Sequence, residues 1–298
     1  MKVLIACECS QTVCTEFRKL GVECYSCDIE KEYGDHPEWH IQGDVLNVLH
    51  GNCEFITNDG KHHYIDRWDL VVAHPPCTYF SLAQMPLYDR KRFGDECVNR
   101  RLARQREAFK FFLEFTKLGI PTVIENPPGK LTTLYRKANQ TIQPYQFGDP
   151  ATKATCLWLF GLPKLQPTKQ VSPPPAHVFP SSNSMGGWYY ETSCLPAKDR
   201  ARARSKTFPG IAKAIATQYT RFLKLFCGLN DVITLRKPKR LQNRVDRLPL
   251  SGCTWMQCMV VLRLLQPDKR GKIRTLCSVN QRHSVDCPMF NGCMALFD

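Results

Sequence analysis

The sequence predicts an α/β protein with a doubly wound, mostly parallel sheet and a small basic, cysteine-rich carboxyl-terminal appendage. Two observations predict the sheet. Short apolar runs alternate with helical patterns through the first half of the 298 residues, and each run ends at a polar or breaker residue. The appendage is predicted because a basic link, Arg236–Arg240 and Arg244–Arg247, follows Gly228 and leads into a segment rich in cysteine.

The elements can be placed from periodicity. A helix after the first strand has Val13, Phe17 and Leu20 on one face and ends at Gly21. A second, longer helix follows the polar loop 89–92, and a third opens at Pro209. The expected strands are residues 3–6, 22–26, 70–73, 120–124 and 156–160, and the expected helices are 13–20, 99–118 and 209–226.

The stretch around Cys77 stands out. The apolar run Leu70–Ala73 predicts a buried strand, and Pro75 and Pro76 then stop it because they lack backbone donors and restrict φ. Cys77 is therefore expected at the carboxyl end of a strand, where open α/β sheets place their ligands.

Other polar groups follow strands in the same way. If these strands are parallel, the side chains gather at one edge of the sheet. The residues expected there are Glu8, Asp28, Asp44, Cys77 and Glu125.

The amino-acid composition indicates what kind of molecule the protein binds. The net charge of +14 favours a polyanion, with nucleic acid as the first candidate. No apolar run approaches the ~20 residues that a membrane span needs. The amino terminus lacks a signal-peptide layout, and the 16 cysteines show no secreted framework, so we expect a soluble, cytoplasmic protein with reduced thiols.

Pro75-Pro76-Cys77 and Glu125-Asn126, each at a strand end, resemble the two motifs that carry the nucleophile and the acid in DNA cytosine-5 methyltransferases. The form His-Pro-Pro-Cys-Thr-Tyr looks most like compact, phage-type members. The likeness runs from Met1 to about Phe226, in the family's motif order. It implies a Rossmann-like, S-adenosylmethionine-dependent methyltransferase acting on DNA in a bacterial or phage-infected cell, and we expect a monomer.

The resemblance implies roles for three residues. Cys77 would attack C6 of a flipped cytosine, and Glu125 would contact N3 and donate a proton. Such chemistry favours a thiol pKa below ~8.5. Lys153 aligns with a family segment rich in arginine and could lower that pKa, contact the base or face a phosphate.

The resemblance also implies a cofactor site at Cys7, Glu8, Asp28, Asp44 and Pro75. The family's first motif is usually rich in glycine, whereas residues 7–11 contain none. Each acidic residue, taken alone, is equally compatible with a helix cap or a solvated loop end.

We predict a methyltransferase domain over 1–228 and an extension over 229–298. Within the domain, 164–205 has little periodicity and stands where the family inserts its target-recognition region, for which it is short. Gly186–Tyr190 beside an arginine-rich run is compatible with DNA contacts or with a packed aromatic cluster. We predict no metal site, since the tail cysteines lack the tight Cys-x2-Cys spacing of zinc ligands, and no role for His62 and His63.

Two other functions stay open. His74-Pro75-Pro76 resembles the Pro-Pro motif of N4 and N6 amino-methyltransferases, although these need an aromatic residue where Cys77 stands. The second is that of a DNA-binding protein of the same fold with weakened catalysis. The missing glycines and the loss of arginines around Lys153 favour it.

Overall fold

The structure is a computed structural model that describes residues 1–173, 175–179 and 184–235. It divides into two compact units, Met1–Leu223 and Lys224–Asp298. The tail cysteines and the basic link after Gly228 lie outside the described residues, and so does nearly all of the predicted extension.

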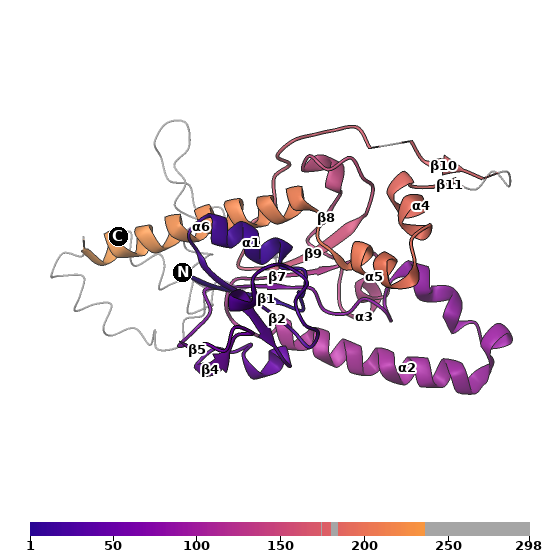
Figure 1. Cartoon of the computed structure of the whole chain (residues 1–298), viewed down its shortest axis with the longest axis horizontal. Coiled ribbons are helices and arrows are strands. Elements are labelled where there is room, and N and C mark those ends of the chain that lie inside the picture. Colours follow the sequence, from indigo (N-terminus) through magenta and orange to yellow (C-terminus); the bar gives the residue numbers. More distant parts are fainter. Residues whose placement is uncertain (174, 180–183, 236–298) are drawn as a thin grey trace, which may run out of the picture. The chain divides into compact units, whose positions relative to one another are not determined.

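A seven-stranded sheet organises the first unit, in the order β3-β2-β1-β6-β7-β9-β8 (Figure 1). Its strands are β1 (Lys2–Ala6), β2 (Glu23–Asp28), β3 (His40–Gln42), β6 (Leu70–Ala73), β7 (Thr122–Asn126), β8 (Gln140–Ile142) and β9 (Thr155–Phe160). Two hairpins stand apart: β4 (Cys53–Ile56) with β5 (His62–Ile65), and β10 (His177–Val178) with β11 (Ser184–Met185).

The parallel part of the sheet is doubly wound. β1 pairs in parallel with β2 on one side and with β6 on the other, and β6 pairs in parallel with β7. The chain therefore moves outward from β1 to β3 and then returns to β6. This reversal puts the carboxyl ends of β1 and β6 where open α/β sheets form their ligand-binding crevice. The α/β fold with a mostly parallel sheet is confirmed.

The far end of the sheet is antiparallel. β9 pairs in antiparallel register with both β7 and β8, and Asn126 lies opposite Cys156. The start of β9 therefore lies at the same edge as the end of β7. This reversal brings the residues just before β9, Lys153 among them, toward the crevice.

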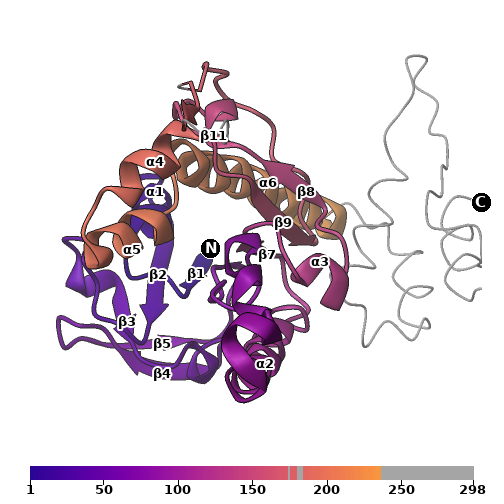
Figure 2. The same ribbon diagram turned by 90° about the vertical axis from the view of Figure 1, so that its right-hand side faces the viewer.

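Helices cover both faces of the sheet (Figure 2). The helices are α1 (Thr12–Lys19), α2 (Arg90–Phe115), α3 (Leu131–Leu134), α4 (Gly187–Ser193), α5 (Ala197–Ser205) and α6 (Pro209–Leu235). Short 3-10 turns are η1 (Pro37–Trp39), η2 (Val45–Asn47), η3 (Leu82–Tyr88) and η4 (Pro144–Gln146).

Successive side chains of a strand point to opposite faces of the sheet, so each strand contributes apolar residues to a core on each face. Leu4 of β1 and Val71 of β6 belong to the cluster that contains Phe112 and Phe115 of α2. Their sequence neighbours in the strands are also fully buried, as are Val13 and Phe17 of α1 and Ile215 and Tyr219 of α6. Both faces are therefore apolar, as a parallel sheet requires.

The sequence predictions were wrong at several boundaries. α2 begins at Arg90, inside the predicted polar loop, because the Asp89 side chain caps it by accepting the Lys91 amide. The helix is interrupted at Gly94, whose φ of 76° is not helical. The segment 164–205, predicted to lack regular structure, contains α4, α5 and the β10–β11 hairpin.

Candidate active site

The Cys77 loop is built as its prolines suggested. β6 ends at Ala73, and the His74 amide still donates to the Ala6 carbonyl at 2.9 Å, so the loop starts in register with β1. Pro75 is buried and its carbonyl accepts from Asn126 Nδ2 at 2.8 Å. Cys77 is exposed, and its carbonyl accepts from the amides of the residues three and four positions on, which turns the chain.

The loop after β7 is joined to the loop after β6. Lys130 donates its amide to the Phe80 carbonyl at 2.8 Å, and Leu82 donates its amide to the Pro128 carbonyl at 3.2 Å. Gly129 is required between them, because a Cβ there would lie 1.9 Å from the Phe80 carbonyl oxygen. The loops that carry Cys77 and Glu125 are therefore fixed to each other by backbone contacts.

Glu125 is held by His74. His74 Nδ1 lies 3.2 Å from Glu125 Oε2, and the two side chains are 11% and 21% exposed. Burial raises the pKa of Glu125, but the hydrogen bond and charge of His74, and then the charge of Lys153, outweigh it, so the pKa lies below its ordinary value. In the free protein Glu125 is a carboxylate at neutral pH.

Two polar atoms beside this pair are buried without a hydrogen-bond partner among the described residues. They are His74 Nε2 and Asn126 Oδ1. Buried polar atoms are rarely left unpaired unless water or a ligand completes them. At the ends of β6 and β7, these two atoms are therefore open to a further hydrogen-bond partner.

The predicted low pKa of Cys77 is wrong for the free protein. Desolvation and then the Glu125 carboxylate raise the pKa of the thiol above its ordinary value, and the Lys153 ammonium lowers it only in part. Lys153 therefore acts in the expected direction. Although Cys77 is exposed at the surface, the surrounding loops still remove water from its thiol, and this desolvation and the neighbouring carboxylate are stronger than the effect of Lys153.

Lys153 also supports the segment that follows. Its Nζ donates to the Arg204 carbonyl at 2.8 Å and lies over the rings of Trp188 and Phe208 at 5.7 and 6.0 Å. The ammonium thus stabilises the carboxyl end of α5, where helix carbonyls are unpaired. Its contacts are structural, while its charge reaches Cys77 and Glu125.

Helices α4 and α5 form a packed unit beside the site. Arg204 donates to the Tyr189 carbonyl and to Thr192 Oγ1, both at 3.0 Å. Burial raises the pKa of Tyr189; the charge of Arg204 opposes this, and the charges of Cys77 and Glu125 add to it. The aromatic residues of α4 pack: Trp188 lies 5.1 Å from Phe208, and Tyr190 stacks on His177 at 3.7 Å.

The turn after β1 makes its bend without glycine. Cys7 and Gln11 take left-handed conformations, with φ of 60° and 57°. This conformation costs a residue other than glycine about 1–2 kcal/mol. Burial raises the pKa of Cys7 well above its ordinary value, which leaves a neutral thiol at this turn.

Glu8 is not placed to bind a ligand. Oε1 accepts the Val13 amide at 2.8 Å and the Ser10 hydroxyl at 3.1 Å, while Oε2 accepts the Cys14 amide at 3.2 Å. The buried carboxylate therefore caps α1. The cofactor role predicted for Glu8 is replaced by this structural one.

Asp28 and Asp44 keep one oxygen each for a ligand. Asp28 Oδ1 accepts the Glu30 amide and Asp44 Oδ1 accepts the Leu46 amide, each at 3.0 Å. The second oxygen of each has no donor within the part of the chain that the structure describes. A Cβ added to Gly43, beside Asp44, would meet nothing within 4 Å.

His74 and Arg204 were given no role of their own by the sequence. His74 was noted only within a Pro-Pro motif, whereas Tyr189 and Arg204 belong to the aromatic stretch and the arginine-rich run for which DNA contacts and a packed aromatic cluster both stayed open. Proximity in the sequence to Cys77 was the available pointer to His74. His63 lies 3.1 Å from the Tyr25 hydroxyl and stacks on Phe55.

Other features limit the chemistry of the described residues. Ten cysteines among them are free thiols, and no group of three or more His, Cys, Asp or Glu there is arranged to hold a metal ion. None of the helices within these residues has the length and apolar character that crossing a bilayer demands.

The fold and this edge define an α/β protein with a doubly wound sheet and a polar site beyond β1, β6 and β7. No protein-family model matches the chain, and no curated protein matches it.

Proposed function

We propose that the chain is a DNA cytosine-5 methyltransferase that uses Cys77 as the nucleophile and Glu125 as the acid. The observation that carries the proposal is the fixed pairing of the two loops. An exposed thiol and a largely buried carboxylate stand at the ends of neighbouring strands, on the edge where open α/β sheets bind their ligands.

The protonation states of the free protein suggest how the two groups act together. Cys77 holds its proton and Glu125 lacks one. The proposed reaction needs the reverse. Because the Glu125 charge raises the pKa of Cys77, a proton taken up by Glu125 as the base binds would remove that charge and favour the thiolate.

The protons can be followed through the site. Cys77 passes its proton to Glu125, and as the Cys77 sulfur forms a bond to C6, N3 gains that proton from Glu125. After C5 has gained its methyl group, the C5 proton is lost to water, the sulfur–C6 bond breaks, and the N3 proton returns through Glu125 to the Cys77 thiolate. One proton is therefore exchanged between Cys77 and N3 through Glu125, and one proton is released to water for each methyl group transferred.

The residues fit an adenosine-type cofactor in part. Asp28 and Asp44 each offer a carboxylate oxygen, which suits ribose hydroxyls and an amine, and the space beside Gly43 is open. When bound, S-adenosylmethionine would supply the methyl group. Cys7 and the buried ring of Pro75 would border it, whereas Glu8 would only hold the turn.

DNA is the proposed substrate because of the charge of +14 and the open approach to Cys77. Extrahelical presentation of the base would cost a few kcal/mol. Incubating the protein with cytosine-containing DNA and labelled cofactor, followed by mass spectrometry of the nucleosides, tests the proposal. The proposal requires 5-methylcytosine; N4-methylcytosine or N6-methyladenine would favour the amino-methyltransferase alternative.

One observation favours a different function, a DNA-binding member of the fold with little turnover. The raised pKa of Cys77 leaves the free protein with a weak nucleophile. Calorimetry with S-adenosylmethionine separates the two: heat of binding is expected for the enzyme, and its absence would favour the binding protein.

A further inference from the structure

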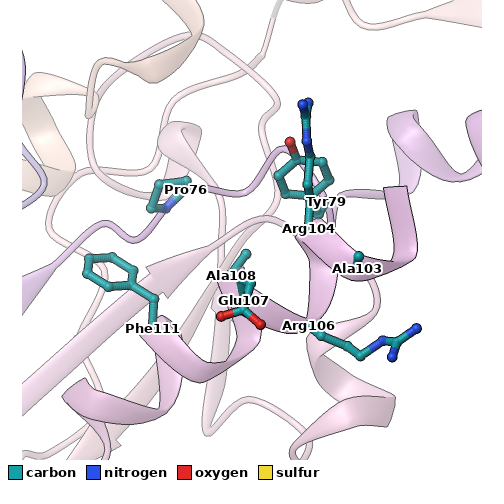
Figure 3. A pocket seen from close by; sticks show the side chains of 8 residues that line it. All are labelled: Pro76, Tyr79, Ala103, Arg104, Arg106, Glu107, Ala108 and Phe111. Atoms are coloured by element: carbon teal, nitrogen blue, oxygen red, sulfur yellow. The ribbon is translucent and has the colours of Figure 1, made fainter. Parts of the chain in front are cut away.

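A pocket of about 570 Å³ lies on the other side of the Cys77 loop, against α2. Figure 3 shows Pro76 and Phe111 at one end, Tyr79 and Arg104 at the other, and Ala108 and Glu107 between them. Ala103 and Arg106 complete the lining. Pro76 and Tyr79 bracket Cys77 in the chain, so the pocket borders the proposed reaction site.

The loop wall of the pocket is held in place. The Tyr79 carbonyl accepts from Gln105 Nε2 at 2.6 Å and from the Tyr88 hydroxyl at 2.9 Å. Arg101 donates to the Thr78 carbonyl at 3.1 Å and lies over the Tyr79 ring at 5.3 Å. The pocket is therefore prearranged, and a ligand would not have to order it.

The charge of the pocket is not neutralised. Within the described residues, Arg104 and Arg106 form no ion pair or hydrogen bond, and both are exposed. The acidic lining residue, Glu107, is paired with Lys110 at 2.9 Å. Figure 3 shows the Arg104 side chain beside Tyr79, whereas the Arg106 guanidinium points away from the wall made of Tyr79, Phe111, Pro76 and alanine.

We propose that this pocket binds a nucleotide of the DNA strand adjacent to the target cytosine, an inference that rests on the proposed function. A nucleobase matches the aromatic and aliphatic wall, since bases stack on such side chains. A phosphate matches the unpaired Arg104 guanidinium beside Tyr79, since a guanidinium can bind a phosphate in bidentate fashion. A bare anion would leave the apolar wall unused, and a purely apolar ligand would leave the arginines unused.

The pocket also gives the chain a means of sequence preference outside residues 164–205. A neighbouring base stacked on Tyr79 would be selected by its stacking area. Purines would therefore be preferred to pyrimidines at that position.

Fluorescence anisotropy tests this with short single-stranded oligonucleotides that contain one cytosine and no cofactor. One set carries an abasic position on either side of the cytosine. The Arg104→Ala/Arg106→Ala variant is compared with Lys117→Ala/Lys213→Ala, which removes the same charge elsewhere. Because all four side chains are exposed, the folds can be matched by circular dichroism.

The wild type is expected to lose at least about fivefold in affinity when one neighbouring base is removed. The double arginine variant should bind the intact oligonucleotide about tenfold more weakly than the wild type does. The slope of the logarithm of its association constant against the logarithm of the salt concentration should be smaller in magnitude by about 1–1.5. The lysine control should stay within about twofold of the wild type in 0.15 M salt, since distant exposed charges are screened.

Two results distinguish a failure of the pocket assignment from a failure of the proposed function. Suppose that the wild type methylates cytosine, that the arginine variant binds DNA as tightly as the wild type, and that abasic strands bind as tightly as intact ones. The pocket assignment is then wrong and the proposed function stands. If the wild type neither binds these strands nor methylates cytosine, both are wrong.

Discussion

His74 Nδ1 lies 3.2 Å from Glu125 Oε2, and this contact joins the first residue after β6 to the end of β7. It fixes one oxygen of the carboxylate and leaves the other available to a base. His74 also accounts for the lowered pKa of Glu125 against the opposing effect of burial. We therefore treat His74 as a positioning residue for the proposed acid.

Replacing His74 should raise the pKa of Glu125. In His74→Leu the donor is lost while burial remains, so the carboxyl should titrate above its ordinary value. His74→Asn keeps a neutral donor near the position of Nδ1 and should give a smaller rise. Carbon-13 NMR of the Glu125 carboxyl group, assigned with Glu125→Gln, measures this without any activity.

The same two variants should also differ in their kcat values. His74→Leu is expected to lower kcat by about 10- to 100-fold because the acid is misplaced, and His74→Asn should recover most of that loss. A role in folding alone would change thermal stability in both variants and leave the pKa of Glu125 where it is in the wild type.

The reactivity of Cys77 should rise with pH. Its raised pKa means that little thiolate is present at neutral pH, so alkylation by iodoacetamide should accelerate through the alkaline range. Lys153→Met should raise the pKa further and slow alkylation at neutral pH, whereas Glu125→Gln should lower the pKa and accelerate it. Mass spectrometry of the Cys77 peptide follows this thiol alone; equal rates in all three proteins would contradict the electrostatic account.

Glu8 and Asp28 should respond differently to substitution. Glu8→Gln weakens the cap of α1 and should cost about 1–2 kcal/mol of stability in urea unfolding. Asp28→Asn keeps the oxygen that accepts the Glu30 amide, so stability should change by less than about 0.5 kcal/mol.

Calorimetry with S-adenosylmethionine completes the comparison. Asp28→Asn should bind at least about fivefold more weakly than the wild type, since a hydrogen bond to a charged group contributes about 1.5–3 kcal/mol. If Asp28→Asn bound the cofactor as well as the wild type does, the cofactor position would be wrong.

Gly129 should tolerate no side chain. In Gly129→Ala the Cβ would meet the Phe80 carbonyl oxygen at 1.9 Å, and that oxygen is fixed by the Lys130 amide. The two loops must separate, at a cost of about 1–3 kcal/mol. Gly43→Ala is the matched control for thermal unfolding, because its Cβ would meet nothing within 4 Å.

Much of the sheet could be predicted because its signals are local. The run Leu70–Ala73 is bounded by breakers, and the structure has β6 at these residues. Since parallel strands share an edge, placing Cys77 and Glu125 together needed only their positions after two strands. Asp28 and Asp44 follow β2 and β3 for the same reason.

The rest of the fold and of the candidate site depends on contacts between residues that are far apart in the sequence. Lys153 donates to the Arg204 carbonyl, and Arg204 in turn holds Tyr189 and Thr192, so α4 and α5 are stabilised by tertiary contacts. No periodicity reports such contacts. The same limit explains Glu8: its position after a strand could not show that α1 would occupy its carboxylate.

The direction of the Cys77 pKa could not be predicted from neighbours in the sequence either. It depends on how closely Glu125 and Lys153 approach the thiol and on how much water the loops exclude. These are properties of packing, and they reverse the expectation that a nearby lysine had suggested.

The central claim is that Cys77 forms a covalent bond to cytosine. We would incubate the wild type and Cys77→Ala with S-adenosylmethionine and DNA containing 5-fluorocytosine, whose fluorine cannot leave as the C5 proton does. Denaturing electrophoresis and peptide mass spectrometry should reveal a DNA adduct on Cys77 in the wild type and none in the variant. Methylation of ordinary cytosine by Cys77→Ala, or an adduct on another residue, would contradict the account.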